Sequence, residues 1–455
     1  MNFNRSIVLF FVLSVLTACK PSGNETDGGA GFTLISSKHS GITFNNKVED
    51  QQDFNILTYR NYYNGGGVAI GDINNDGLND LFFTANMLPN KLYLNKGDFR
   101  FEDISESAGV GGTHYWSTGV AFADVNADGL LDIYVCNSGD ISGANRENEL
   151  FINNGNLTFT ESAAAYGLND DGYSTHAAFF DYDLDGDLDC FVLNNSYTDP
   201  KRIASNASGS RKNFGAPGGD RLYEQQGGRF VDVTEKAGLF SGDIDFGLGA
   251  SVGDINNDGY PDIYVSNDFW ERDYLYLNMQ NGTFKEVLPD QMDYISANSM
   301  GADIADINND GYQDIFSTDM LPASNYRMKS ALMIEEYHLE GLKWRNSYFY
   351  QYIQNCLHIN KGDGAFHELA FFSDVAATDW SWGALIFDMD NDGRKDIFVS
   401  NGIYHDITDL DFINFLADEE QLKKVVKESG RVDFRDFVGY LPHNKQQNFA
   451  FINQG

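Results

Sequence analysis

The chain has 455 residues, with 67 Asp and Glu against 31 Lys and Arg, and its formal net charge is −36 at pH 7. So acidic a chain argues against nucleic acid as a partner, because nucleic-acid-binding domains present basic patches to the phosphates. The length is sufficient to bury a large core, either as one domain of repeats or as two or three globular domains.

The N-terminus has the features of a targeting segment. Arg5 precedes an apolar run at residues 7–16, which is too short to span a bilayer as a mature helix. The run ends in the sequence LTAC at residues 16–19 and resembles a bacterial lipoprotein signal, which is cleaved before a Cys that then carries lipid. A Cys that follows an apolar leader by chance is the alternative. We expect a signal peptide at residues 1–19, lipid on Cys19 and a flexible polar tether at residues 20–30.

This leader implies that the protein contacts a membrane through its N-terminal lipid. The expected location is the cell outer membrane, with the periplasmic side and the surface side both left open by the sequence.

A nine-residue motif occurs six times, at residues 72–80, 124–132, 181–189, 254–262, 306–314 and 388–396. In every copy the first, fifth and ninth residues are Asp, the third is Asn or Asp, and the sixth is Gly. Ca²⁺ takes about six to eight oxygen ligands, and a loop that wraps around it offers one at every second residue. The Gly permits the positive φ that a tight wrap requires. We therefore expect up to six Ca²⁺ sites.

The expected ligands are the side chains at positions one, three, five and nine, and the backbone carbonyl at position seven. Position seven of the third copy is an Asp, whose side chain is a further candidate. The full set is Asp72, Asn74, Asp76, Leu78, Asp80, Asp124, Asn126, Asp128, Leu130, Asp132, Asp181, Asp183, Asp185, Asp187, Asp189, Asp254, Asn256, Asp258, Tyr260, Asp262, Asp306, Asn308, Asp310, Tyr312, Asp314, Asp388, Asp390, Asp392, Arg394 and Asp396.

The loop has two alternative interpretations, an EF-hand and a simple hairpin turn. An EF-hand requires a bidentate Glu at position twelve, where the first copy has Phe83, and it requires flanking helices where this chain has strand-like apolar runs. An Asn/Asp-Gly turn that only reverses a hairpin is the simpler alternative. Six copies with the same acidic or amide positions favour the metal interpretation.

Each repeat is predicted to contain four short strands, in the order strand, Asp loop, strand, connector, strand, tight Gly turn, strand. In the first repeat the predicted strands are residues 67–71, 81–84, 91–94 and 99–104. Four short strands recurring every 50 to 80 residues are typical of a β-propeller blade. The predicted fold over residues 31–455 is therefore an all-β propeller with six visible repeats, seven-bladed or a fragment of a seven-bladed protein.

Nearly all variation in repeat length lies in the connector between the second and third strands. In an antiparallel blade these connectors share one face, opposite the Asp loops, and insertions on one face usually form the binding face of a repeat protein. The predicted insertions are residues 200–220, 322–352 and 404–447, with helices expected at 328–342 and 411–427. Neutral drift in tolerant loops is the alternative.

Six residues on this insertion face are candidates for ligand binding. Aromatic side chains near carboxylates suit sugars or peptides, although these aromatics could equally pack the insertions onto the propeller. The candidates are Trp270, Asp268, Asp319, Trp344, His405 and Asp406.

The motifs resemble a known repeat family. The Asp loops, with the run FGLGA at residues 246–250 and WGA at 382–384 before two of them, are similar to the FG-GAP or VCBS repeats of the integrin α-subunit propeller. NGGGV at residues 64–68 and LYLN at 92–95 are similar to bacterial outer-membrane lipoproteins related to cartilage acidic protein, many of which carry an ASPIC/UnbV segment. The resemblance covers residues 31–455. It implies Ca²⁺ in each loop and implies no reaction.

The last residues match a third strand and its Gly turn, at 448–455, and residues 32–36 resemble a fourth strand. The N-terminus could therefore complete the sixth blade, or the sequence is a fragment of a seven-bladed protein. We favour the fragment, because a closing ring usually completes its final turn.

Recognisable catalytic motifs are scarce in the sequence, which has no Gly-x-Ser-x-Gly elbow and no phosphate-binding loop. The leading hypothesis is a calcium-stabilised, lipid-anchored propeller, more a binding protein than an enzyme, that takes a glycan or protein ligand on its insertion face for adhesion or nutrient capture. One alternative is a polysaccharide-active hydrolase or lyase, which converging carboxylates in the central channel would favour. Another is a structural partner of an outer-membrane transporter, which a large apolar patch would favour.

Overall fold

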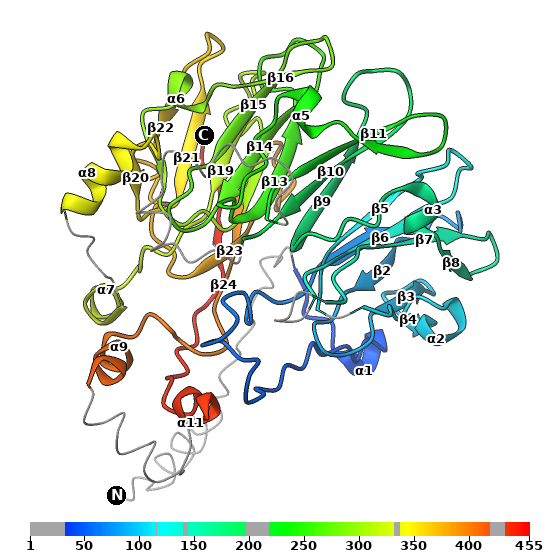
Figure 1. Ribbon diagram of the computed structural model, residues 1–455, viewed down its shortest axis with the longest axis horizontal. Coiled ribbons are helices and arrows are strands. Elements are labelled where there is room, and N and C mark those ends of the chain that lie inside the picture. The colour runs from blue at the N-terminus through cyan, green and yellow to red at the C-terminus, as the bar shows by residue number, and fades with distance from the viewer. Residues whose placement is uncertain (1–31, 115, 140–143, 197–217, 332–336, 419–432) are drawn as a thin grey trace, which may run out of the picture. The chain divides into compact units, whose positions relative to one another are not determined.

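The computed structural model describes residues 32–114, 116–139, 144–196, 218–331, 337–418 and 433–455 (Figure 1). Residues 36–455 form one compact unit, and residues 1–35 form a separate one. The expected signal peptide, Cys19 and the tether lie outside the described residues, as does most of the expected 200–220 insertion. In the described part of the chain, no helix combines the length and apolarity needed to cross a bilayer.

Six antiparallel sheets follow one another along the chain, and we call them blades 1 to 6. Five have four strands each in simple up-and-down order, and the sixth has three strands among the described residues. Blades 1 to 3 are β1 (Val68–Gly71), β2 (Asp80–Phe83), β3 (Lys91–Asn95) and β4 (Phe101–Asp103); β5 (Ser117–Ala123), β6 (Asp132–Asn137), β7 (Glu149–Asn153) and β8 (Phe159–Glu161); and β9 (Ser174–Phe180), β10 (Asp189–Asn194), β11 (Arg221–Gln225) and β12 (Phe230–Asp232). Blades 4 to 6 are β13 (Gly247–Gly253), β14 (Asp262–Asn267), β15 (Tyr274–Asn278) and β16 (Phe284–Glu286); β18 (Ala302–Ala305), β19 (Asp314–Ser317), β21 (Cys356–Asn360) and β22 (Phe366–Glu368); and β23 (Ser381–Phe387), β24 (Asp396–Asn401) and β25 (Phe449–Phe451).

This arrangement confirms the predicted all-β propeller of four-stranded blades, with an Asp loop between the first and second strand of every blade. The predicted strand boundaries agree with the structure to within one or two residues in blade 1. Residues 32–36, which resemble a fourth strand in sequence, form no strand in the structure.

Short helices occupy the connections. α1 (Ser37–Ser40) precedes blade 1, and four single-turn helices follow the fourth strands: α2 (Ser105–Ala108), α3 (Ala163–Tyr166), α5 (Thr234–Ala237) and α6 (Leu288–Gln291). The blade 5 insertion carries α7 (Asn325–Ala331) and α8 (Tyr337–Arg345), and the blade 6 insertion carries α9 (Leu410–Ala417) and α11 (Phe434–Val438). Helices occur in both insertions, as predicted. The helix expected at 328–342 is described as α7 and α8, on either side of residues 332–336, and residues 419–427 of the helix expected at 411–427 lie outside the described residues. The sequence did not predict α11. The two-residue strands β17 (Ile295–Ser296) and β20 (Gln351–Tyr352) pair in parallel.

Apolar side chains form a core between each pair of consecutive blades, from blades 1 and 2 to blades 5 and 6. Cys136, Cys190 and Cys356 are buried and free in these blades, as small hydrophobic residues would be. The joint between blades 1 and 6 is different. A cluster that includes Phe54 and Tyr62 on the N-terminal side packs against Phe412 and other residues of the blade 6 insertion.

The ninth residue of each Asp loop connects three parts of the fold. In blade 4 both oxygens of the buried Asp262 accept backbone N–H groups, from Ile255 at 2.9 Å and from Asn278 at 2.7 Å. The Asn278 amide then donates to the carbonyl of Tyr182 in blade 3, at 2.7 Å. The carboxylate therefore ties its own loop to the third strand, and the Asn ties that strand to the preceding blade.

This Asp–Asn clamp recurs along the chain. The carboxylate half is repeated at Asp80, Asp132, Asp189, Asp314 and Asp396. The amide bond to the preceding blade is repeated at Asn153, Asn360 and Asn453.

The clamp generates a prediction for stability. Asn360 is buried, and its amide donates to Ile255 O at 2.8 Å and to Gln313 O at 3.1 Å. Asn360→Ala leaves both buried carbonyls without these donors and should lower the free energy of unfolding by about 1–3 kcal/mol. The neighbouring exposed Lys361→Ala should change it by less than about 0.5 kcal/mol. Urea unfolding measures both, and equal values for the two variants would contradict a role for the clamp.

Candidate functional site

The six Asp loops share one backbone conformation. In the first loop the N–H groups of Asp76 and Gly77 donate to the Asp72 carboxylate, at 3.1 and 2.7 Å. Gly77 has a φ of 86°, which agrees with the expectation for position six, and Asn75 at position four has a φ of 57°. The other five loops repeat these features. Each loop therefore curls around its own carboxylates.

The donor set of these loops fits a hard cation. Carboxylate oxygens of Asp181, Asp183 and Asp189 lie within 4.8 Å of one another, as do those of Asp388, Asp390 and Asp392. These two loops have Asp at position three, where the other four have Asn, whose amide oxygen is also a Ca²⁺ ligand. The residues at positions one and three, together with the carboxylate at position five or position nine, would hold the ion.

The carboxylates at position nine are more constrained than the sequence suggests, since both oxygens of each already accept an N–H. Burial, together with nearby carboxylates, raises the pKa of Asp132 and Asp314 to about 6 and that of Asp189 and Asp262 to about 7. These residues have a structural role in addition to any contact with an ion.

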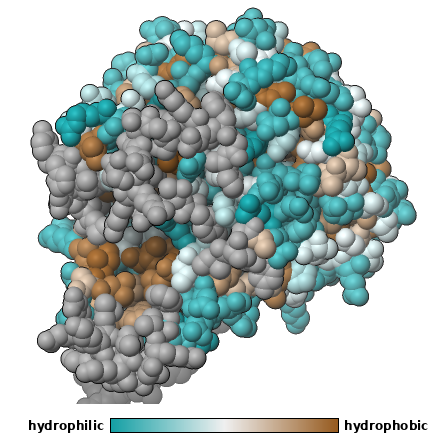
Figure 2. Space-filling model, viewed as in Figure 1, coloured by the Kyte–Doolittle hydropathy of each residue, from teal (hydrophilic) through white to brown (hydrophobic). Residues whose placement is uncertain are grey.

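On the opposite face a cavity of about 520 Å³ lies among blades 4, 5 and 6 and the segment before β1. Its size falls within the usual range of about 300–1,000 Å³ for small-molecule sites. Figure 2 shows apolar side chains gathered beside the segments that carry α7 and α9. The insertions expected at 322–352 and 404–447 contribute to the lining.

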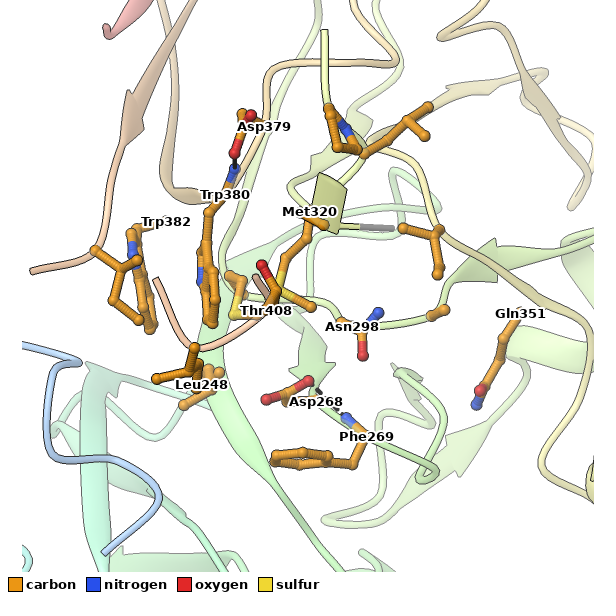
Figure 3. Close-up of a pocket in the computed structure, with 18 of the residues that line it drawn as sticks. Leu248, Asp268, Phe269, Asn298, Met320, Gln351, Asp379, Trp380, Trp382 and Thr408 are labelled. Carbon is orange, nitrogen blue, oxygen red and sulfur yellow. Dashed lines mark hydrogen bonds between the residues drawn. The ribbon is translucent and has the colours of Figure 1, made fainter. Parts of the chain in front are cut away.

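One wall of the cavity is apolar (Figure 3). The rings of Trp380 and Trp382 are stacked, with their centroids 6.3 Å apart and their planes 19° apart. Leu248 and Met320 lie beside them, and Phe269 lies on the floor. These side chains offer a broad surface for the apolar face of a ligand.

Polar side chains lie across from this wall. Asp268 accepts the N–H of Phe269 at 2.7 Å. Gln351 donates to the carbonyls of Trp270 and Tyr348 at 3.0 Å each, and its Oε1 has no hydrogen-bond partner among the described residues. Asn298 also lines the cavity. The site thus combines an aromatic wall with hydrogen-bond acceptors.

The basic side chains around the cavity form ion pairs or contact aromatic rings. Arg327 on α7 forms ion pairs with Asp379 at 3.0 Å and with Asp406 at 2.5 Å. The Arg60 guanidinium lies over the Phe269 ring, 4.4 Å from its centroid. Lys343 lies 5.7 Å from the centroid of the Trp270 ring. The Arg327 pairs also join the blade 5 and blade 6 insertions.

Of the six residues predicted from the sequence to bind a ligand, the structure places only two in the lining of the cavity. Asp268 and Trp270 line the cavity. Asp319 is buried outside it and accepts hydrogen bonds from Ser296, Ala297 and Asn298.

The other three candidates surround the cavity. Asp406 lies outside the lining but bonds to two lining residues, Arg327 and Thr408, and Trp344 is exposed on α8, also outside the lining. His405 packs against Tyr63 and His443.

Sequence reasoning missed most of the lining. The WGA run at 382–384 contained Trp382, but it was used only as a repeat marker. No local sequence pattern marks the other lining residues, because they come from different parts of the chain. They include Trp380, Met320, Asn298, Gln351 and Arg60.

A second cavity, of about 210 Å³, lies where the first strands of the blades meet and is lined by residues such as Gly66, Thr118, His176 and Trp382. Its described lining contains no Asp or Glu. Converging carboxylates at the centre, which would have favoured an enzyme, are thus not found in the part of the chain that the structure describes.

Comparisons with known proteins agree with this fold and its loops. The chain is an FG-GAP-repeat β-propeller protein, since the FG-GAP-like repeat family matches residues 72–135, 138–192, 213–265 and 254–317. It is homologous to cartilage acidic protein 1, with 32% identity to the Xenopus tropicalis protein over 208 residues and 30% identity to the human protein over 207 residues. These matches cover 46% and 45% of this chain but only 29% and 28% of those proteins, so the chain spans less than a third of the length of these relatives.

More distant similarities were also found. A T-cell immunomodulatory protein homolog of Plasmodium yoelii yoelii is 25% identical over an alignment of 353 residues, and the match covers 61% of this chain and 46% of that protein. The Bacillus licheniformis rhamnogalacturonan lyase PL11 structure has a TM-score of 0.37 and 12% identity over 75% of this chain and 56% of its own. The V. cholerae biofilm matrix protein Bap1 has a TM-score of 0.35 and 13% identity over 66% and 38%.

The site generates a prediction for pH dependence. Burial raises the pKa of Asp268 to about 7 from an ordinary value of 3.8, the nearby Asp319 adds to the rise, and the Phe269 N–H and Arg60 oppose it. The folded state therefore holds the Asp268 proton more tightly than the unfolded state, and this stabilisation is lost as the pH rises through the window from about 4 to about 7.

Asp268→Asn removes this titration because its amide is neutral at every pH. The difference in Tm between variant and wild type should shift in favour of the variant as the pH rises through that window. The exposed Asp290→Asn is the matched control, and the shift for Asp268→Asn is measured relative to it. Thermal unfolding across pH measures both, and parallel curves for Asp268→Asn and wild type would contradict the shifted pKa.

Proposed function

We propose that this protein is a calcium-stabilised, lipid-anchored β-propeller of the outer membrane that binds a glycan or protein ligand in the cavity on its insertion face. The observation that carries the proposal is the cavity itself. It lies opposite the Asp loops, on the face that holds all the length variation of the repeats, and it joins a Trp wall to polar groups that can receive a ligand.

The chemistry of the lining favours binding over catalysis. Trp380 and Trp382 suit a flat apolar face, while the Asp268 carboxylate and the Asn298 amide can form hydrogen bonds with the edge of the same ligand. Asp379 also lines the cavity, but its carboxylate is engaged by Arg327. A ligand of low charge therefore meets few unpaired ions.

A polysaccharide-active enzyme is the second candidate, and Asp268 is the observation that favours it. A carboxyl group with a pKa near 7 in a cavity is suited to act as a general acid. Glu340 on α8 is a further carboxylate of the lining. Product analysis on every bound glycan separates this candidate from the binding protein, because only an enzyme releases shorter or unsaturated fragments.

Ca²⁺ in the Asp loops is part of the proposal. The loops crowd carboxylates together, and a divalent cation relieves that repulsion while gaining oxygen ligands. Its binding would reinforce the Asp–Asn clamp, because the clamp carboxylate is the ninth residue of the same loop.

Removal of the metal tests this part. EDTA should lower the Tm strongly, Ca²⁺ should restore it, and Mg²⁺ should restore it poorly because Mg²⁺ requires a stricter octahedron. Differential scanning calorimetry measures the effect. A melting curve that EDTA leaves unchanged would contradict the metal sites.

A binding screen tests the ligand cavity. The chain from residue 20 onward, with Ca²⁺ present, is screened against glycans and surface proteins. Met320→Trp, which fills the cavity, should weaken binding at least about tenfold, a loss of roughly 1.4 kcal/mol. Met279→Trp is the matched control, since Met279 is exposed on a tight turn of the opposite face. Ligands that bind Met320→Trp as tightly as wild type would show that the cavity is not the site.

A further inference from the structure

A row of exposed aromatic side chains lies on the blade 5 insertion, beside the cavity. Trp344, Tyr350 and Tyr352 are 42%, 45% and 46% exposed. The Trp344 ring contacts the Tyr350 ring with a centroid distance of 5.3 Å. We call these three residues the aromatic shelf.

The shelf is continuous with the cavity. Tyr352 belongs to both, since it lines the cavity and is also half exposed. Gln351 lies between the two Tyr residues and lines the cavity as well. On α8, Glu340 and Lys343 contribute to the lining, and Trp344 is the next residue. The lining and the shelf are therefore two parts of one surface.

The backbone holds the shelf in place before any ligand binds. The carbonyls of Tyr350 and Tyr352 accept the N–H groups of Ile295 and Ala297, at 3.0 Å each, where β17 pairs with β20. The Tyr352 ring makes an edge contact with Tyr294, at a centroid distance of 5.2 Å. Rings fixed in this way lose little conformational entropy on binding.

We infer that the cavity and the aromatic shelf together form one elongated binding site for a neutral glycan chain. One end of the chain occupies the cavity against Trp380 and Trp382, and the sugars that follow stack on Tyr352, Tyr350 and Trp344. This inference rests on the proposed function and deepens it, because it specifies an oligosaccharide rather than a single sugar.

Two features favour a glycan over a protein side chain as the occupant. The Asp268 carboxylate and the Asn298 amide offer hydrogen-bonding groups among apolar walls, and a hydroxyl-rich ligand supplies donors that an apolar side chain does not. Sugar rings also carry an apolar face and a polar edge, which match an aromatic surface that adjoins these polar groups. A neutral chain experiences no repulsion from a protein with a net charge of −36.

The test uses ladders of β-1,4-linked glucose and xylose oligomers, from the monosaccharide upward, titrated calorimetrically into the protein with Ca²⁺ present. Affinity should rise with chain length. Trp344→Ala and Tyr350→Ala should each weaken binding of the long oligomers about tenfold and leave the shortest bound oligomer unaffected. Phe99→Ala is the control, because Phe99 is also an exposed aromatic residue, 66% exposed, but lies on a tight turn of the opposite face.

The remaining outcomes overturn the inference in different ways. An affinity that is independent of length, or that survives both shelf substitutions, excludes the elongated site and leaves the proposed function standing. If the sugars fail to bind while a protein ligand binds and is lost in Met320→Trp, the shelf belongs to a protein interface. If neither sugars nor proteins bind in a way that depends on Met320, the proposed function fails as well.

Discussion

The buried carboxylate at the ninth position of each Asp loop is the constraint on which the propeller depends. Both of its oxygens accept backbone N–H groups, one from its own loop and one from the end of the third strand. A buried carboxylate without such donors would carry a large desolvation cost, so the loop and the strand must keep their register. The Asn at the strand end then carries the constraint to the preceding blade.

Because of this constraint, the connections on the two faces of the propeller differ in how much their length can vary. Loop, clamp and tight turn lie on one face, where one inserted residue would break several buried hydrogen bonds. The connectors on the other face carry none of these bonds and can lengthen into α7, α8, α9 and α11. The aromatic shelf lies on one of these longer connectors, and the connectors also contribute part of the lining of the cavity.

The fold could be predicted from the sequence because its determinants are local and repeated. The site could be predicted only where a residue directly followed a second strand, as Asp268 and Trp270 do. Asp319 also follows a second strand, but it is enclosed by donors from residues 296–298, an arrangement that depends on tertiary packing. Trp380 and Arg60 are 320 positions apart, and only the closure of the fold places both in one lining.

The closure between blades 1 and 6 has a thermodynamic consequence for any occupant of the cavity. Among the described residues, these two blades meet at the Phe54 cluster, whereas the other consecutive blade pairs share a core between two sheets. The cavity lining comes from both sides of this joint, with Arg60 and Tyr63 on one side and Trp380 and Ile407 on the other. A ligand that requires both sides at once stabilises their association by linkage, and thus acts as a latch across the joint between blades 1 and 6.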